Sequence, residues 1–180
     1  GGIVYYVLNM PVKNIYISGN KIVSDDEVLS LSGLDSYPSF LLTSSFDIKN
    51  SILNNKCIDD VNVIKRFGNV IELEIIEHSV IAMDMDGRLI MSSGFRLDNS
   101  YNISDIPRLI SYVNDDIVSN FAKKFGKVDI NILREVSEIE YSPVSVDSDR
   151  FLLYMNDGNL VYITLTKVHK LNKYNKIKDK

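Results

Sequence analysis

The residues with the most evident chemical potential are Asp84, Asp86 and Gly87, which form a D-x-D-G pattern. Carboxylates at this spacing open the calcium loop of an EF-hand, but that loop also needs a distal glutamate, and the rest of its pattern is missing here. An Asp-Gly pair between apolar runs is instead a strong hairpin signal. We interpret Asp86-Gly87 as a β-turn, and Asp157-Gly158 in the same way.

Cys57 is the only cysteine, so the chain has no internal disulfide framework. A catalytic cysteine needs a histidine and a group that orients it. The two histidines, His78 and His169, lie in different parts of the sequence, and Cys57 immediately precedes an apolar strand pattern. We interpret it as a small buried side chain. With no nucleophile-elbow, zinc-protease, Walker or dinucleotide-binding pattern either, the sequence predicts no enzymatic activity, no cofactor and no metal site.

Cations gather at the C-terminus, and apolar residues recur among them at every third position. We interpret this segment as a solvated helix end, because cations suit the C-terminal end of a helix. Contact with an anionic surface, either a lipid headgroup layer or a wall polymer, is the alternative, and each lysine would then add about 1 kcal/mol near a membrane. The cations are Lys167, His169, Lys170, Lys173, Lys176, Lys178 and Lys180, and the apolar residues are Val168, Leu171, Tyr174 and Ile177.

Composition sets broad limits on function. The chain has 180 residues, 45% of them hydrophobic, and a net charge of −4, which fits one soluble domain or two small ones and gives no case for nucleic-acid binding. Ile3–Leu8 is apolar but far shorter than the roughly 20 residues of a membrane helix. It is either a first strand or lead-in, or the outer end of a membrane span that begins upstream.

Residues 11–78 predict a small module. Val12–Ser18 alternates like a half-buried strand. Ser24 and Glu27 fit a capping box that opens a helix ending at Gly33. A second helix begins at Ser44 or Ser45 and ends at Asn54-Asn55.

Two further strands complete this module. Ile58–Arg66 and Val70–Ile76 flank the turn Phe67-Gly68-Asn69, and in the second run Ile71, Leu73 and Ile75 are expected to face in while Glu72 and Glu74 face out. The predicted order is therefore β-α-α-β-β, a three-stranded sheet with two helices, which is typical of a binding module.

Residues 79–180 predict a second, β-rich domain, so the fold class is α+β. A hairpin surrounds Asp86-Gly87, and Asn114 caps a helix over 115–125 with one apolar face. Strands are expected at 136–142, 151–155 and 160–165. We expect a mixed, mostly antiparallel β-domain with a helix, followed by the Lys-rich C-terminal helix.

These segments resemble one protein family in an ordered series. "VKNIYISGN" and "SDDEVLSLSGL" resemble the opening of a POTRA module. "VNVIKRFGNVIELEIIEHSVIAMDMDGRLI" resembles the closing hairpin of that module in FtsQ/DivIB cell-division proteins, where the hairpin ends in a glutamate, here Glu77, and continues into a β-domain. "DIPRLI", "VSEIEYS" and "MNDGNLVYI" follow in the expected order.

The resemblance implies a division scaffold. Members have a cytoplasmic tail, one membrane helix, which this sequence lacks, and the POTRA and β-domains outside the cytoplasmic membrane at the division septum. They bind small single-pass partners of the FtsL and FtsB/DivIC type and help control septal peptidoglycan synthesis. The alternative is a POTRA-type chaperone or docking module in protein export, where such modules usually occur in tandem before a barrel.

The resemblance also implies where a partner binds. In this family the partner adds a strand to the edge of the β-domain sheet near its C-terminal end, so that backbone hydrogen bonds supply affinity and alternate side chains supply specificity. The matching edge is Leu160–Leu165, with Leu160, Tyr162 and Thr164 as partner-binding residues. Two points stay open: Val12–Ser18 is a competing edge, and the additional strand that many members carry after the last helix is not found.

Overall fold

The computed structural model describes residues 1–178, which form two compact units. Unit 1 comprises Gly1–His78, and unit 2 begins at Ser79. The mixed α+β architecture, with a three-stranded sheet and helices in unit 1 and a seven-stranded sheet in unit 2, confirms the predicted fold class.

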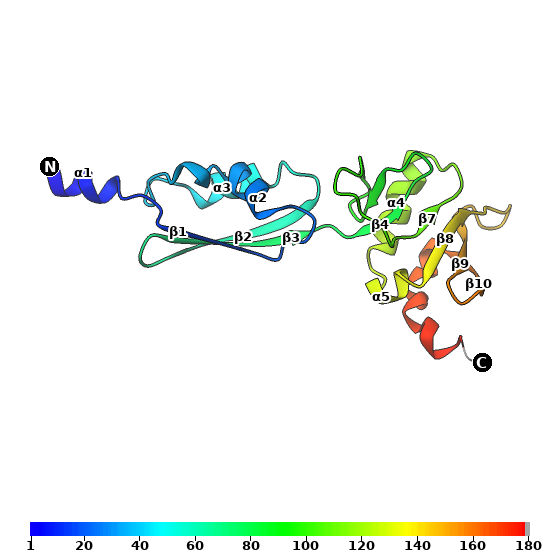
Figure 1. Ribbon diagram of the computed structural model, residues 1–180. Helices are drawn as coiled ribbons and strands as arrows, with labels where there is room; N and C mark the ends of the chain where they lie inside the picture. The colour runs from blue at the N-terminus through cyan, green and yellow to red at the C-terminus, as the bar shows by residue number, and fades with distance from the viewer. Residues whose placement is uncertain (179–180) are drawn as a thin grey trace. The chain divides into compact units, whose positions relative to one another are not determined.

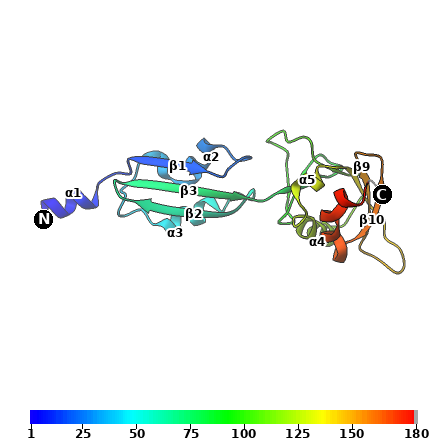
Figure 2. The same ribbon diagram turned by 90° about the horizontal axis from the view of Figure 1, so that it is seen from below.

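Unit 1 is a three-stranded sheet with helices on one of its faces (Figure 1). The strand order is β1-β3-β2, with β1 parallel and β2 antiparallel to β3, so β3 lies in the middle (Figure 2). The alternation of β3 buries Ile71, Leu73 and Ile75. The elements are α1 (Gly2–Leu8), β1 (Asn14–Ser18), α2 (Asp25–Ser32), the 3₁₀ turn η1 (Leu34–Ser36), α3 (Ser45–Ile52), β2 (Ile58–Arg66) and β3 (Val70–Glu77).

Local hydrogen bonds set where α2 begins and how it meets α3. Ser24 accepts a hydrogen bond from the backbone N–H of Glu27 at 3.2 Å, as the capping pattern predicts. The Glu27 carboxylate accepts from the Asn55 side-chain amide at 2.8 Å, which links α2 to the segment after α3.

The end of β3 is tied to the segment that follows β1. The Glu77 carboxylate accepts hydrogen bonds from the backbone N–H groups of Lys21, Ile22 and Val23 at 2.8–3.0 Å. Nearby, Gly19 has φ +86°, and a Cβ there would lie 2.2 Å from the carbonyl oxygen of Ile75. Only glycine fits this close approach between two backbones.

Residues Ile3–Leu8 lie in the helix α1 rather than in a first strand, so the strand alternative is wrong. All residues of α1 are solvent-exposed, so burial against the rest of unit 1 does not select an extended strand. Among residues 1–178, no helix is both long and apolar enough to cross a membrane.

Unit 2 contains a seven-stranded mixed sheet in the order β10-β9-β8-β7-β4-β5-β6. The pairs β4–β7 and β7–β8 are parallel and the others are antiparallel. The elements are β4 (Val80–Met83), β5 (Leu89–Met91), β6 (Arg96–Leu97), β7 (Arg108–Leu109), α4 (Asp115–Phe125), α5 (Ile130–Leu133), β8 (Val136–Tyr141), β9 (Arg150–Met155), β10 (Leu160–Thr164) and the 3₁₀ helix η2 (Leu165–Lys176).

An aromatic cluster lies at the centre of unit 2. Phe121 and Phe125 of α4 contact each other and the ring of Phe151 on β9, with the Phe121 and Phe151 centroids 4.9 Å apart. All three side chains are fully buried. The apolar face predicted for this helix therefore packs against the sheet.

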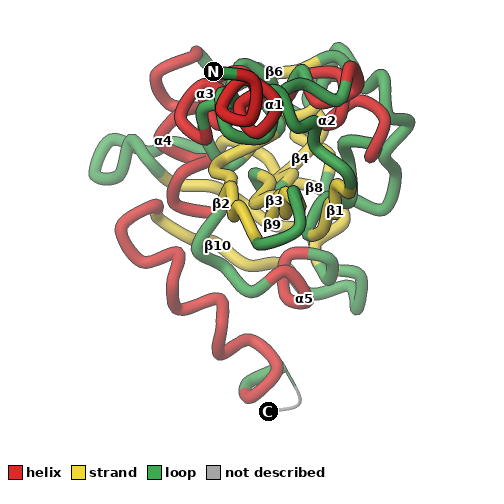
Figure 3. Tube along the Cα trace, turned by 90° about the vertical axis from the view of Figure 1, so that its left-hand side faces the viewer, coloured by secondary structure: helices red, strands yellow, loops and turns green. Residues whose placement is uncertain are grey.

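The C-terminal helix is a 3₁₀ helix, which explains the spacing of its apolar residues. A 3₁₀ helix has three residues per turn, so side chains three apart lie on one face. Of the predicted series, Val168, Leu171 and Tyr174 are buried in the core of unit 2 together with Leu165, whereas Ile177 follows η2 and is exposed, so this helix packs on the unit rather than forming only a solvated end. Figure 3 shows this segment continuing directly from β10 toward the C-terminus.

Candidate functional site at a sheet edge

The candidate site is the outer edge of β10, which pairs with β9 and stands at one end of the strand order. The Met155 N–H donates to the Asn159 carbonyl, and the Leu165 N–H donates to that of Asp149. Hydrogen-bonded pairs alternate along an antiparallel ladder, so Val161 and Ile163 bond to β9. The backbone N–H and C=O groups of Leu160, Tyr162 and Thr164 consequently point away from β9.

The side chains of β10 separate into two faces. Val161 and Ile163 pack against the core of unit 2. Leu160 and Tyr162, on the other face, are 59% and 58% exposed. Because these residues also direct their backbone groups outward, the three sequence-predicted residues form one row at the edge.

Two contacts fix part of this row. The Arg150 guanidinium lies over the Tyr162 ring, 4.6 Å from its centroid, and its Nε donates to the Ser142 carbonyl at 2.8 Å. The Thr164 hydroxyl donates to Asp147 Oδ1 at 3.1 Å. Tyr162 is therefore an oriented, half-exposed ring, and the Thr164 side chain is already engaged.

The sequence reasoning missed the residues of β8 and β9 that share this face. Antiparallel pairing places Leu152 opposite Tyr162, and Tyr154 opposite Leu160. The Tyr154 hydroxyl donates to Glu140 Oε2 at 2.8 Å, and this hydrogen bond is the main reason that the pKa of Tyr154 is raised. Pairing the residues on the two sides of the Asn156–Asn159 turn one by one would have identified Leu152 and Tyr154 from the sequence.

The turn before β10 is held by η2. The Tyr174 hydroxyl bonds to the Asp157 carboxylate, with its oxygen 2.7 and 3.0 Å from Oδ2 and Oδ1, and accepts from the Asn159 amide at 2.9 Å. The Asn159 backbone N–H, followed by the Tyr174 hydroxyl, lowers the pKa of Asp157. Burial is the main cause that raises the pKa of Tyr174.

Unit 1 has two further sheet edges. Beside β1, a groove of about 330 Å³ is lined by residues that include Lys13, Tyr16, Asp26 and Leu29. Beside β2, a groove of about 420 Å³ separates the strand from α3.

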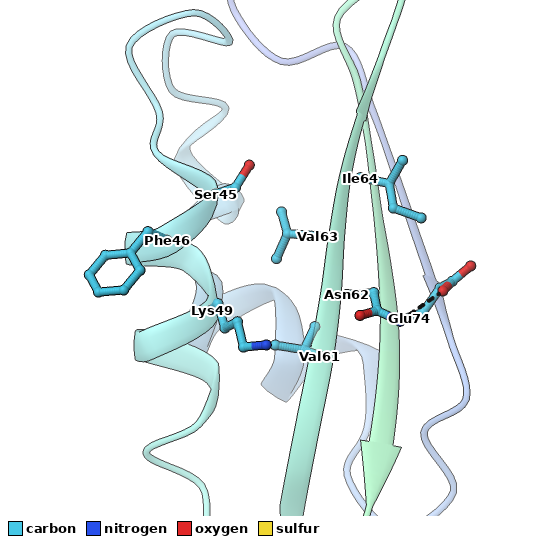
Figure 4. A pocket seen from close by; sticks show the side chains of 8 residues that line it. All are labelled: Ser45, Phe46, Lys49, Val61, Asn62, Val63, Ile64 and Glu74. Carbon is cyan, nitrogen blue, oxygen red and sulfur yellow. Dashed lines mark hydrogen bonds between the residues drawn. The ribbon is translucent and has the colours of Figure 1, made fainter.

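Figure 4 shows the side chains of this second groove. Val63 points from β2 toward α3, whereas the Phe46 ring points away from the strand. The ammonium of Lys49 and Oδ1 of Asp60 are 2.6 Å apart, and this contact is the main cause that lowers the pKa of Asp60. An ion pair therefore links α3 to β2 beside the groove.

The remaining chemically suggestive residues have structural roles. Asp84 Oδ1 accepts from the backbone N–H groups of Asp86 and Arg88 at 3.0 and 2.9 Å, so its carboxylate stabilises the turn. Cys57 is buried in unit 1. Residues 1–178 contain no group of three His, Cys, Asp or Glu side chains placed to hold a metal ion.

The lysines of the tail lie on and after η2. The Lys178 ammonium lies 3.2 Å from Glu135 Oε2 and forms an ion pair within unit 2. Lys180 lies outside the described residues.

Comparison with known proteins agrees with this architecture. Residues 10–78 match the family model described as a POTRA domain of the FtsQ type. The chain is 30% identical over 171 residues to the cell division protein DivIB of Brevibacillus brevis, which covers 89% of this chain and 63% of that protein. It is also 30% identical over 155 residues to DivIB of Bacillus subtilis, covering 83% of this chain and 59% of that protein. The chain thus spans about three fifths of the length of these relatives.

A solved structure is also similar. The major extracytoplasmic domain of DivIB from Geobacillus stearothermophilus matches with a TM-score of 0.50 and 26% sequence identity. The match covers 57% of this chain and 92% of that domain.

Proposed function

This chain belongs to the FtsQ/DivIB family of cell-division proteins, and from that premise we propose that it is a non-enzymatic scaffold of the division machinery. It acts outside the cytoplasmic membrane at the division septum, anchored by a single membrane helix that lies outside this sequence. Its partners are small single-pass division proteins of the FtsL and FtsB/DivIC type, and through them it helps control septal peptidoglycan synthesis.

The observation that supports this proposal is the open edge of β10. A partner segment in extended form pairs with the outward backbone groups of Leu160, Tyr162 and Thr164 and becomes an eighth strand of the sheet. Its side chains on the outer face contact Leu160 and Tyr162, which supply exposed apolar surface for specificity.

A second candidate function rests on the groove between α3 and β2. An extended client peptide bound there would make unit 1 a chaperone or docking module in export. The β10 edge is favoured because its apolar side chains lie in one row with free backbone groups, whereas the groove is bordered by the Lys49–Asp60 ion pair and Phe46 points out of it.

A pair of matched variants tests the proposed site. Tyr162→Lys places a charge in the middle of the β10 edge, and we expect it to weaken binding of the purified partner ectodomain at least about tenfold. Tyr16→Lys makes the same change at a 59% exposed tyrosine of the β1 edge and should leave the affinity unchanged. Isothermal titration calorimetry measures both, and circular dichroism checks folding. A loss of affinity in Tyr16→Lys alone would assign the site to β1.

A pull-down from the native host with the full-length protein tests the function itself. Mass spectrometry should identify small single-pass division proteins, and the Tyr162→Lys bait should recover less of them. Recovery of outer-membrane precursors without division proteins would replace the scaffold by the export function.

A further inference from the structure

One end of unit 1 combines exposed apolar side chains with basic residues. Three segments meet there: residues 8–13 from the last residue of α1 onward, residues 39–44 before α3, and residues 65–70 at the β2–β3 turn. Figures 1 and 2 show that this turn and α1 lie at the same end of unit 1. We call the surface formed by these three segments the basic–apolar end.

Hydrogen bonds join the three segments. The Phe40 N–H donates to the Met10 carbonyl at 2.8 Å, and the Ser39 hydroxyl donates to the Leu8 carbonyl. The Lys13 N–H donates to the Asn69 carbonyl at 2.9 Å. The surface is therefore a fixed arrangement rather than three independent loops.

A lysine links the loop before α3 to β2. The Lys65 ammonium donates to the carbonyls of Phe40 and Thr43 and lies 4.5 Å from the centroid of the Phe40 ring. These contacts hold the loop in place, with its Leu41 and Leu42 side chains facing solvent.

The apolar side chains of this end have an unusual exposure. Phe67, at the tip of the β2–β3 turn, is 104% exposed, and Leu41 and Leu42 are also exposed. The adjoining helix α1 adds exposed apolar residues from Ile3 to Leu8. Apolar surface gathered in this way marks a site that another apolar phase or molecule covers.

The basic and acidic residues of unit 1 are unevenly distributed. Three of its six basic residues, Lys13, Lys65 and Arg66, lie in the basic–apolar end, and all ten of its acidic residues lie outside those three segments. Arg66 is paired with Glu72 at 2.7 Å, so Lys13 and Lys65 carry most of the excess positive charge. This distribution complements an anionic surface.

From these observations we propose that the basic–apolar end docks on an anionic lipid bilayer, with Phe67, Leu41 and Leu42 entering the boundary between headgroups and acyl chains. Aromatic and aliphatic side chains at loop tips, with lysines behind them, suit this boundary. The helix α1 adjoins this surface, and its exposed apolar length of about 10 Å is enough to enter the boundary beside them. The contact would hold unit 1 against the bilayer and is independent of any partner at β10.

A tryptophan probe tests the depth of Phe67. The sequence contains no tryptophan, so Phe67→Trp introduces a single reporter at the turn, and Met85→Trp introduces one at the exposed β4–β5 turn of unit 2 as a matched control. Each variant is mixed with vesicles that contain phosphatidylglycerol. We expect the emission of the tryptophan in Phe67→Trp to shift to the blue and to be quenched by brominated acyl chains, with neither change in Met85→Trp.

Charge substitutions test the contribution to binding. Phe67→Glu should weaken flotation with these vesicles at least about fivefold, whereas Met85→Glu should not, and both variants should fold because the side chains are exposed. Binding should also weaken between about 0.05 and about 0.5 M NaCl and in phosphatidylcholine vesicles.

Three results would overturn the proposal. One is no flotation at low salt. Another is flotation of the Phe67→Trp variant without any change in its tryptophan emission, which would mean that α1 binds alone. The third is a concentration-dependent blue shift without vesicles, which would assign the surface to a second copy of the chain.

Discussion

Each of the two units has an edge strand of five residues, but the side chains around these two strands differ. β1 and β10 each contain five residues, and each has a tyrosine in the middle that is nearly 60% exposed. Both therefore offer a similar set of outward backbone groups. The residues around the two tyrosines differ.

On β1 the cross-strand partners of Tyr16 and Ser18 are Glu72 and Glu74, so the tyrosine lies in an acidic, polar row. On β10 the partner of Tyr162 is Leu152, and Arg150 lies over the ring. An open edge supplies hydrogen bonds to any extended chain, whereas the side chains beside it choose which chain binds. The apolar and cationic neighbours of Tyr162 therefore favour β10 as the selective edge.

The largest effect is expected when the close approach of Gly19, directly after β1, to the backbone of β3 is disrupted. Gly19→Ala places a Cβ 2.2 Å from the Ile75 carbonyl oxygen at a φ of +86°, and we expect the free energy of unfolding of unit 1 to fall by at least about 3 kcal/mol. Gly68→Ala has the same sign of φ but nothing within 4 Å, and should cost only about 1 kcal/mol. Hydrogen exchange at β3 and β9 amides measures the two units separately. If partner binding survives Gly19→Ala, β10 acts without an intact β1.

Proline substitutions separate inward from outward backbone groups. Val161→Pro removes an N–H that bonds to β9, and should destabilise unit 2 by about 3 kcal/mol. Tyr162→Pro removes an outward N–H, so we expect the free energy of unfolding to fall by less than about 1 kcal/mol. The affinity for the partner should fall at least about tenfold. Tyr16→Pro places a proline at the central position of β1 and should preserve binding. Urea denaturation and calorimetry measure these values, and unchanged affinity in Tyr162→Pro would contradict strand addition at β10.

A smaller effect is expected at the hydrogen bonds that hold the turn before β10. Tyr174→Phe removes the hydroxyl that contacts Asp157 and Asn159, and should lower the stability of unit 2 by about 1 kcal/mol at pH 7.

This effect should depend on pH in a defined direction. The pKa of Asp157 is lowered in the folded chain, first by the Asn159 N–H and then by Tyr174, so its contribution is complete above the unfolded pKa of about 4 and is lost as the pH falls through the folded value. The stability difference between wild type and Tyr174→Phe should therefore shrink below about pH 4. A difference that is constant from neutral to acidic pH would show that the Asp157 contact is not involved.

The smallest effect is expected at Arg150. Arg150→Ala removes the cation above the Tyr162 ring, and should reduce partner affinity about twofold because the ring loses its preferred orientation. Arg150→Lys keeps a cation near the ring and should have an intermediate affinity. An unchanged affinity in Arg150→Ala would mean that the backbone row binds without an oriented tyrosine.

Much of the fold could be predicted from local patterns. The alternation of Val70–Ile76, the Ser24 cap and the Asp-Gly turns each depend on residues close in sequence, so the corresponding elements appear where they were expected. The two-residue strands β6 and β7 and the short helix α5 gave no such signal, because two to four residues are too few to show a period.

The candidate site likewise has a part that local patterns predict and a part that depends on tertiary contacts. The spacing of Leu160, Tyr162 and Thr164 already placed these side chains on one face of a strand. The contributions of Arg150 and Leu152 needed the register of β9 against β10, and the contact of Tyr174 with Asp157 needed η2 to fold back on the turn. Exposed helix residues such as Ile3–Leu8 have no local pattern that distinguishes a strand from a helix, because no other part of residues 1–178 buries them.

The sequence by itself determined the order of elements, the alternation of β10 and the ordered resemblance to one family, because these depend on neighbours along the chain. Only the tertiary structure decided that β10 is an edge. That property depends on the order of the strands in the sheet, which is set by the pairing of β7 with β4 and β8 and of β8 with β9. No local period in the sequence encodes which side of a strand remains unpaired. The same holds for the basic–apolar end of unit 1, where hydrogen bonds bring together three segments that the sequence separates.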